Sequence, residues 1–94
     1  MNGTGLFGSL MWRWLYVDQL WVAEARRGAG LGRRLLAEAE AIARRRGCIG
    51  AHLFSFSFQA PDFYSRCGYA EAGRLAGLPA GHDWIWLSKR LDAE

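Results

Sequence analysis

The distribution of hydrophobic and polar positions predicts that strands and helices alternate along the chain. Residues 10–23 are rich in aromatic and branched side chains at odd and even positions alike. This pattern is typical of a strand that is buried on both sides, within a sheet covered by helices. Because the segment is longer than most strands, we expect a turn or bulge near Arg13 to divide it. The two predicted faces carry Leu10, Trp12, Trp14, Tyr16, Leu20 and Val22 on one side, and Met11, Leu15, Val17 and Trp21 on the other.

An amphipathic helix is predicted directly after a cluster of glycines. Its apolar side chains recur with the helical period and should form the buried stripe: Leu31, Leu35, Ala39, Ile42 and Ala43, with Leu36 at its edge. The charged side chains should face away from the core: Arg33, Arg34, Glu40, Arg44 and Arg45. Among these, Glu40 and Arg44 are spaced to form a favourable ion pair. Gly47 supplies the residue that ends the helix.

The rest of the chain predicts three more strands and one short helix. The helix begins at Pro61, whose missing N–H is harmless in a first turn, and it ends at Gly68. The strands are predicted at residues 49–58, 70–75 and 82–91, with a turn at 78–81. In the last strand Trp84, Trp86 and Ser88 alternate with Ile85, Leu87 and Lys89. This order predicts an α/β (α+β) fold, a mixed β-sheet with a central strand–helix–strand unit that is parallel and right-handed.

Length and composition describe one small domain with its own core. The chain has 94 residues, of which 51% are hydrophobic, enough to fill a single core. Cys48 and Cys67 lack the spacing of a zinc or redox site, so we expect reduced thiols and no metal. The first residues lack the features of a secretory signal, and no apolar run is long enough to span a bilayer. We therefore expect a soluble, cytoplasmic protein without a membrane partner.

The charge of the chain suits an anionic partner but does not favour nucleic acid. The net charge is +3 and is carried mainly by arginines. Nucleic-acid binding would require a continuous basic face with interleaved aromatic rings, whereas these arginines cluster at the two ends of one predicted helix. We therefore expect no nucleic-acid partner.

The glycine cluster predicts a phosphate-binding loop. Gly28, Gly30 and Gly32 lie among arginines where the helix begins. The first N–H groups of a helix are unpaired and carry the positive end of its dipole, and glycines let an anion approach the backbone closely. The loop is no Walker loop, because Gly-x-x-x-x-Gly-Lys-Ser/Thr is absent. It is no dinucleotide loop either, since Arg33 occupies the place of the third glycine. The alternative is an ordinary helix start with solvated arginines.

Two segments resemble motifs of the GNAT superfamily of N-acyltransferases. The run Arg-Gly-Ala-Gly-Leu-Gly from Arg27 to Gly32 meets the superfamily's acyl-CoA motif, Arg/Gln-x-x-Gly-x-Gly/Ala. The run from Ala60 to Tyr69 is similar to the AxxFYxxxGF segment of the superfamily's next helix. The resemblance covers Leu10 to the C-terminus and implies the GNAT fold, acetyl-CoA as co-substrate and an N-acetyltransferase activity.

The resemblance also implies roles for individual residues. The backbone N–H groups from Gly28 to Arg33 would bind the CoA pyrophosphate. The preceding strand, Leu20 to Ala23, would pair with pantetheine, whose amides satisfy exposed backbone groups. Tyr64 would protonate the leaving thiolate, and Arg66 would meet the 3′-phosphate or the adenine end. The expected cofactor-binding residues are Leu20, Trp21, Val22, Ala23, Arg27, Gly28, Ala29, Gly30, Leu31, Gly32, Arg33 and Arg66.

The expected chemistry is direct attack of an amine on the thioester. The protein would hold the two reactants in line, and a backbone N–H of the pantetheine-binding strand would polarise the thioester carbonyl. Asp18 is the first candidate for the base that takes the proton of the amine, and Glu24 and His52 are weaker candidates. A tyrosine beside a phenylalanine in a short helix is also common in hydrophobic cores, so a purely structural Tyr64 is the alternative.

The chain is shorter than a complete member of the superfamily. The strand and two helices that usually open the domain are lacking, so residues 1–94 are expected to form a single, N-terminally shortened domain. An uncovered sheet edge favours pairing with another chain, and we expect a homodimer or a strand-exchanged oligomer. The alternative to an active enzyme is a non-catalytic module that binds CoA or promotes oligomerisation.

Overall fold

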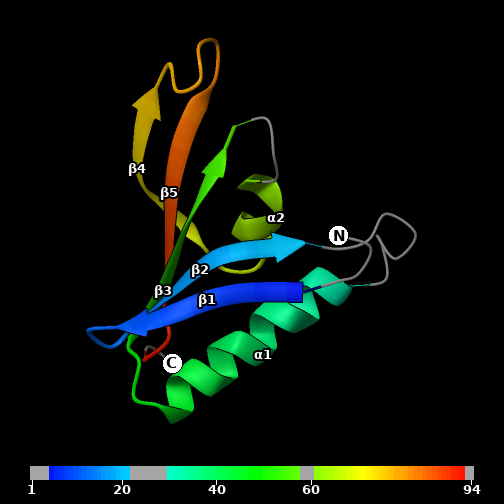
Figure 1. Cartoon of the computed structure of the whole chain (residues 1–94), viewed down its shortest axis with the longest axis vertical. Coiled ribbons are helices and arrows are strands. Elements are labelled where there is room, and N and C mark those ends of the chain that lie inside the picture. The colour runs from blue at the N-terminus through cyan, green and yellow to red at the C-terminus, as the bar shows by residue number, and fades with distance from the viewer. Residues whose placement is uncertain (1–4, 22–29, 58–60, 93–94) are drawn as a thin grey trace.

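The structure, a computed structural model, describes residues 5–21, 30–57 and 61–92 (Figure 1). A single mixed sheet in this part of the chain carries two helices. In chain order the elements are β1 (Gly5–Met11), β2 (Trp14–Trp21), α1 (Leu31–Arg45), β3 (Gly50–Phe56), α2 (Pro61–Arg66), β4 (Ala70–Ala76) and β5 (Asp83–Arg90). Neither helix of the described ranges is long and apolar enough to cross a membrane.

The sheet has five strands in the order β1-β2-β3-β5-β4. Strands β2 and β3 are parallel and are joined through α1, whereas the other neighbouring pairs are antiparallel. The predicted succession of elements and the central parallel strand–helix–strand unit are therefore confirmed.

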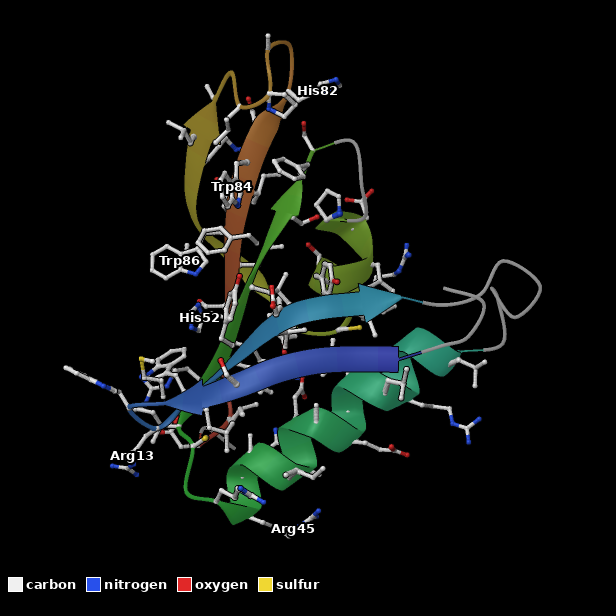
Figure 2. All side chains as sticks on the ribbon, in the orientation of Figure 1. Arg13, Arg45, His52, His82, Trp84 and Trp86 are labelled. Carbon is white, nitrogen blue, oxygen red and sulfur yellow. The ribbon has the colours of Figure 1, made fainter. Side chains whose placement is uncertain are left out.

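A tight turn divides the long apolar segment at the expected place. Trp12 and Arg13 both have positive φ, 56° and 67°, and they connect β1 to β2. Such a pair is typical of a two-residue hairpin turn whose twist matches that of the flanking strands. Arg13 lies at the tip of this hairpin (Figure 2) and donates from Nε to the carbonyl of Gly47, at 3.0 Å. The first strand begins at Gly5, earlier than the pattern predicts.

The hydrophobic core lies on one face of the sheet, under both helices. Alternate residues of the three central strands point into it: Leu15, Val17, Ala51, Leu53, Ile85 and Leu87. Helix α1 contributes Leu36 and Ala43, and Phe63 and Tyr64 of α2 pack against the same cluster. Complete burial of a leucine contributes about 1.5–3 kcal/mol, so these contacts hold both helices on this face.

The prediction that β2 is covered by helices on both sides was wrong. Its second face belongs to a layer of aromatic rings that contact one another across β2, β3 and β5: Trp14, Tyr16, His52, Phe54, Phe56, Trp84 and Trp86. Figure 2 shows the labelled members of this aromatic face along β3 and β5, away from α1 and α2. Large aromatic rings cover one another's sides. The sequence pattern therefore resembles that of strands buried on both faces, although Phe54 and Trp86 remain exposed.

The buried stripe of α1 is rotated from its predicted position. The buried residues of the helix are Gly32, Leu36, Glu40 and Ala43, whereas Ile42 is 45% exposed. Glu40 therefore points inward, and the predicted pair with Arg44 is wrong. Arg44 instead donates from Nε to the carbonyl of Leu91, at 3.1 Å. The rotation brings the carboxylate of Glu40 to its hydrogen-bond donors, Tyr69 and Lys89, within the core.

Candidate active site

The two parallel strands part halfway along their length. Their paired residues extend only from Trp14–Gly50 to Tyr16–His52. Beyond this point β2 continues to Trp21 beside β1, and β3 continues to Phe56 beside β5 (Figure 1). Beyond Tyr16 and His52 the facing edges of the two strands no longer pair, and we call this divergence the opening between β2 and β3. An extended ligand can satisfy backbone groups at such edges.

A bulge in β2 lies at this opening. Phe7 pairs with Gln19 but Gly8 pairs with Val17, so Asp18 is the extra residue. A bulge redirects the side chains that follow it and often occurs beside active sites. Here it leaves Asp18 exposed and turns Leu20 toward the core. The prediction that Leu20 shares a face with Tyr16 was wrong, because strict alternation cannot cross a bulge.

The first turn of α1 is suited to an anion. Gly30 precedes the helix with φ 74°, a left-handed conformation that glycine adopts without strain. The first turn contains no acidic residue, and no side chain of the described residues caps it. Arg33 and Arg34 are exposed there, whereas Leu31 is half-buried and Gly32 buried. The positive end of the helix dipole and the positive side chains of Arg33 and Arg34 therefore lie at the same turn.

Several predicted loop residues cannot be placed. Val22, Ala23, Glu24, Arg27, Gly28 and Ala29 lie outside the described residues. Trp21 is described only as the last backbone position of β2.

Tyr64 occupies the middle of α2 and is half-buried. Its ring meets those of Phe63 and Tyr69 edge-on, with centroids 5.1 and 6.1 Å away. Burial raises the pKa of Tyr64 above its usual value, and the neighbouring Cys67 raises it further. The phenol therefore keeps its proton at neutral and mildly alkaline pH, as a proton donor must.

Cys67 directly follows α2. Burial raises the pKa of the Cys67 thiol, while the positive charge of Arg33, in the first turn of α1, lowers it. Arg66, in the last turn of α2, is exposed.

His52 is held as a neutral hydrogen-bond acceptor. The indole Nε1–H of Trp86 donates to Nδ1 of His52, at 3.1 Å. Burial lowers the pKa of His52 below its usual value, so the neutral ring carries its proton on Nε2. Because the lone pair of Nδ1 is already engaged, His52 is poorly arranged to act as a base, whereas Asp18 is exposed.

Three polar side chains that the sequence did not predict meet beneath α2. Tyr69 donates to Oε2 of Glu40 at 2.8 Å, and Lys89 donates to Oε1 of the same carboxylate at 2.8 Å. The sequence holds one signal for this cluster. Gly32, Leu36 and Ala43 are buried at helical spacing, and position 40 belongs to the same stripe. This spacing is the signal that Glu40 faces inward.

A shallow hollow of about 350 Å³ interrupts the aromatic face. Its walls are formed by Phe54, Gly73, Arg74, Leu75, Trp84 and Trp86. Arg74 is held at its rim by Glu71, 2.7 Å away, and by Asp83. The described residues contain no group of three potential metal ligands.

Comparisons with known proteins agree with this geometry. A family profile described as the acetyltransferase (GNAT) family matches residues 3–69. A blasticidin-S acetyltransferase from Streptomyces morookaense is 53% identical over 88 residues, which cover 93% of this chain and 65% of that protein. An acetyltransferase from Agrobacterium fabrum is 44% identical over 87 residues, which cover 93% of this chain and 64% of that protein.

Solved structures share the fold. The crystal structure of an acetyltransferase from Bacillus cereus superposes with a TM-score of 0.88 at 44% identity, covering 93% of this chain and 62% of that one. The predicted mixed-sheet fold is thereby confirmed. The chain spans slightly less than two thirds of the length of each of these relatives.

Proposed function

Because the chain belongs to the acetyltransferase (GNAT) family, we propose that it transfers an acetyl group from acetyl-CoA to the amine of a small molecule or peptide. One observation carries the proposal. The parted ends of β2 and β3, the first turn of α1 and the helix that bears Tyr64 lie at one end of the sheet. This end provides an opening for an extended ligand, a positive helix terminus for phosphates and a phenol for proton transfer.

In this proposal the backbone N–H groups from Gly28 to Arg33 bind the pyrophosphate of CoA. The strand from Leu20 to Ala23 pairs with pantetheine, and Arg66 reaches the 3′-phosphate or the adenine end. The open edge of β2 beyond Tyr16 and the uncapped first turn of α1 support these assignments.

The proposed reaction is a single displacement at the thioester carbonyl. The nitrogen of the acceptor forms the new C–N bond while the C–S bond breaks. A backbone N–H of β2 stabilises the charge on the carbonyl oxygen. Asp18 accepts the proton that the amine loses, directly or through water, and Tyr64 gives its proton to the departing sulfur.

We propose a small-molecule amine as the first acceptor class to test. The Streptomyces morookaense relative is a blasticidin-S acetyltransferase. The acceptor should approach from the aromatic face, because α1 and α2 cover the other face of the sheet.

We further propose that the chain forms a homodimer or strand-exchanged oligomer through β1. This strand ends the described sheet, and the hairpin beyond it carries Trp12 with 90% of its surface exposed. A free strand edge beside exposed apolar side chains favours pairing. Light scattering at micromolar concentration should give at least twice the 10.5 kDa mass of one chain. A monomeric mass would contradict the proposal.

Release of the CoA thiol tests the catalytic proposal. The chain is incubated with acetyl-CoA and a panel of amines that includes blasticidin S. Tyr64→Phe should reduce kcat by about a hundredfold or more, because general acid catalysis contributes at least that much. Ser65→Ala removes a neighbouring exposed hydroxyl of α2 and serves as the control, with a rate within about twofold of the parent.

Two outcomes would count against this mechanism. Equal rates for the parent and Tyr64→Phe would remove the proposed proton donor. Binding of acetyl-CoA without thiol release for any amine would instead favour the non-catalytic CoA-binding module.

A further inference from the structure

A buried ionic cluster joins three elements that are far apart in the sequence. Glu40 lies on α1, Lys89 on β5 and Tyr69 directly before β4. The carboxylate of Glu40 accepts from Lys89 and from Tyr69, each at 2.8 Å. The ammonium of Lys89 also lies 5.7 Å from the centre of the Tyr69 ring. The Glu40–Tyr69–Lys89 cluster therefore closes a ring of contacts between α1, β5 and the segment that joins α2 to β4.

This cluster is an unusual choice for a small core. Glu40 is 4% exposed and Tyr69 is 3% exposed. A buried carboxylate is destabilising unless donors satisfy it, and apolar residues of similar shape often replace a buried ion pair without loss of stability. We therefore expect the cluster to fix the relative position of the elements that it joins rather than to increase stability. Hydrogen bonds fix directions that apolar contacts leave free.

The cluster is directly connected to the helix of Tyr64. Lys89 donates a second hydrogen bond to the carbonyl of Cys67, at 2.9 Å, where α2 ends. The backbone N–H of Tyr69 donates to the carbonyl of Tyr64, at 3.0 Å. The rings of these two tyrosines meet edge-on. Both the backbone and the side chain of Tyr64 therefore contact Tyr69, a member of the cluster.

The cluster is also connected to the helix that begins at the glycine loop. Glu40 lies on the same buried stripe as Gly32 and Leu36. The cluster therefore contacts both the helix that begins at the glycine loop and the segment that directly follows α2.

We propose that Glu40, Lys89 and Tyr69 are positioning residues that hold the phenol of Tyr64 in register with the first turn of α1. The inference rests on the proposed function, because it assigns Tyr64 the role of proton donor. The three residues do not touch the reacting atoms. They act by fixing Tyr64 at the distance from the thioester sulfur that proton transfer requires, and small displacements at this step reduce rates strongly.

The most conservative test is Tyr69→Phe, which removes one O–H and keeps the ring. In protein that remains folded by circular dichroism, kcat should fall by about tenfold to a hundredfold. The KM for acetyl-CoA should change by less than about threefold, since uniform binding is retained. Lys89→Met should have the same effect, and Arg90→Met is its matched control. Arg90 neighbours Lys89 but pairs with exposed Asp92, so kcat should stay within about twofold.

A double-mutant cycle separates positioning from general destabilisation. In the Tyr64→Phe background, Tyr69→Phe should cause no further loss of kcat, because the group that it positions is gone. Losses that multiply would overturn the inference, and so would an unchanged kcat in Tyr69→Phe. If Lys89→Met fails to fold, Tyr69→Phe and Glu40→Gln decide the question.

The outcomes distinguish this inference from the proposed function. A loss in Tyr64→Phe without a loss in Tyr69→Phe overturns the inference alone. An absence of turnover in the parent chain overturns the proposed function and the inference with it.

Discussion

At the scale of single residues, burial and hydrogen bonding decide what each ionisable side chain can do. Burial keeps Tyr64 protonated. Burial keeps His52 neutral, and Trp86 engages the lone pair of its Nδ1. Asp18 is left exposed by a bulge that the alternation of the strand did not reveal. Tyr64 and Asp18 are therefore our proposed donor and acceptor of protons.

The environment of His52 predicts a pH dependence of stability. Its pKa is lowered from 6.5 in the folded protein, so the unfolded chain takes up a proton first as the pH falls. The free energy of unfolding should therefore decrease as the pH falls through about 6.5. His52→Gln keeps an acceptor for Trp86 but does not titrate. Urea unfolding at pH 7.5 and 5.5 should show a larger loss for the parent than for His52→Gln, and equal losses would contradict this account.

At the scale of elements, the sequence predicted which segments fold but not how they face one another. The order of strands and helices, the division near Arg13 and the helix ends at Gly47 and Gly68 follow from local patterns. The hairpin turn has positive φ at Trp12 and Arg13, although neither is a residue typical of that turn. Hydrogen bonds between the turn and the segment after α1 stabilise this conformation. Such long-range contacts cannot be predicted from a local sequence pattern.

The orientation of α1 was missed for the same reason. A glutamate on a helix is usually solvated, and the partners of Glu40 come from Tyr69 and Lys89, much later in the chain. Of the proposed site, the sequence predicts the glycine loop, Asp18 and Tyr64, and these assignments stay predictions. It could not find the bulge, which depends on the register between β1 and β2, or the cluster beneath α2, which joins elements far apart in the chain.

The rotated stripe of α1 can be tested by two matched truncations. Leu36→Ala should lower the free energy of unfolding by about 2–5 kcal/mol, because it leaves a cavity in a fully buried site. Ile42→Ala should cost less than about 1 kcal/mol, since that side chain is 45% exposed. Chemical denaturation measures both values. Equal losses would mean that the core lies along the stripe predicted from the sequence.

At the scale of the whole molecule, the fold brings two distant sequence motifs to one end of a sheet. The glycine loop follows β2 and the Tyr64 helix follows β3, and parallel strands deliver both to the same edge. The Glu40–Tyr69–Lys89 cluster then connects α1 to the end of α2 through hydrogen bonds. Binding of acetyl-CoA would use the first arrangement, and catalysis would depend on both.

Calorimetric titration with acetyl-CoA is the most direct test of the central claim. The parent chain should bind, and a variant carrying Arg27→Ala and Gly30→Ala should lose binding by at least about tenfold. Gly77→Ala is the matched control, because Gly77 has φ 78° against 74° for Gly30 and a Cβ at either position would meet no atom within 4 Å. Gly77→Ala should bind acetyl-CoA as the parent does. Absence of binding by the parent, or equal binding by the loop variant, would contradict it.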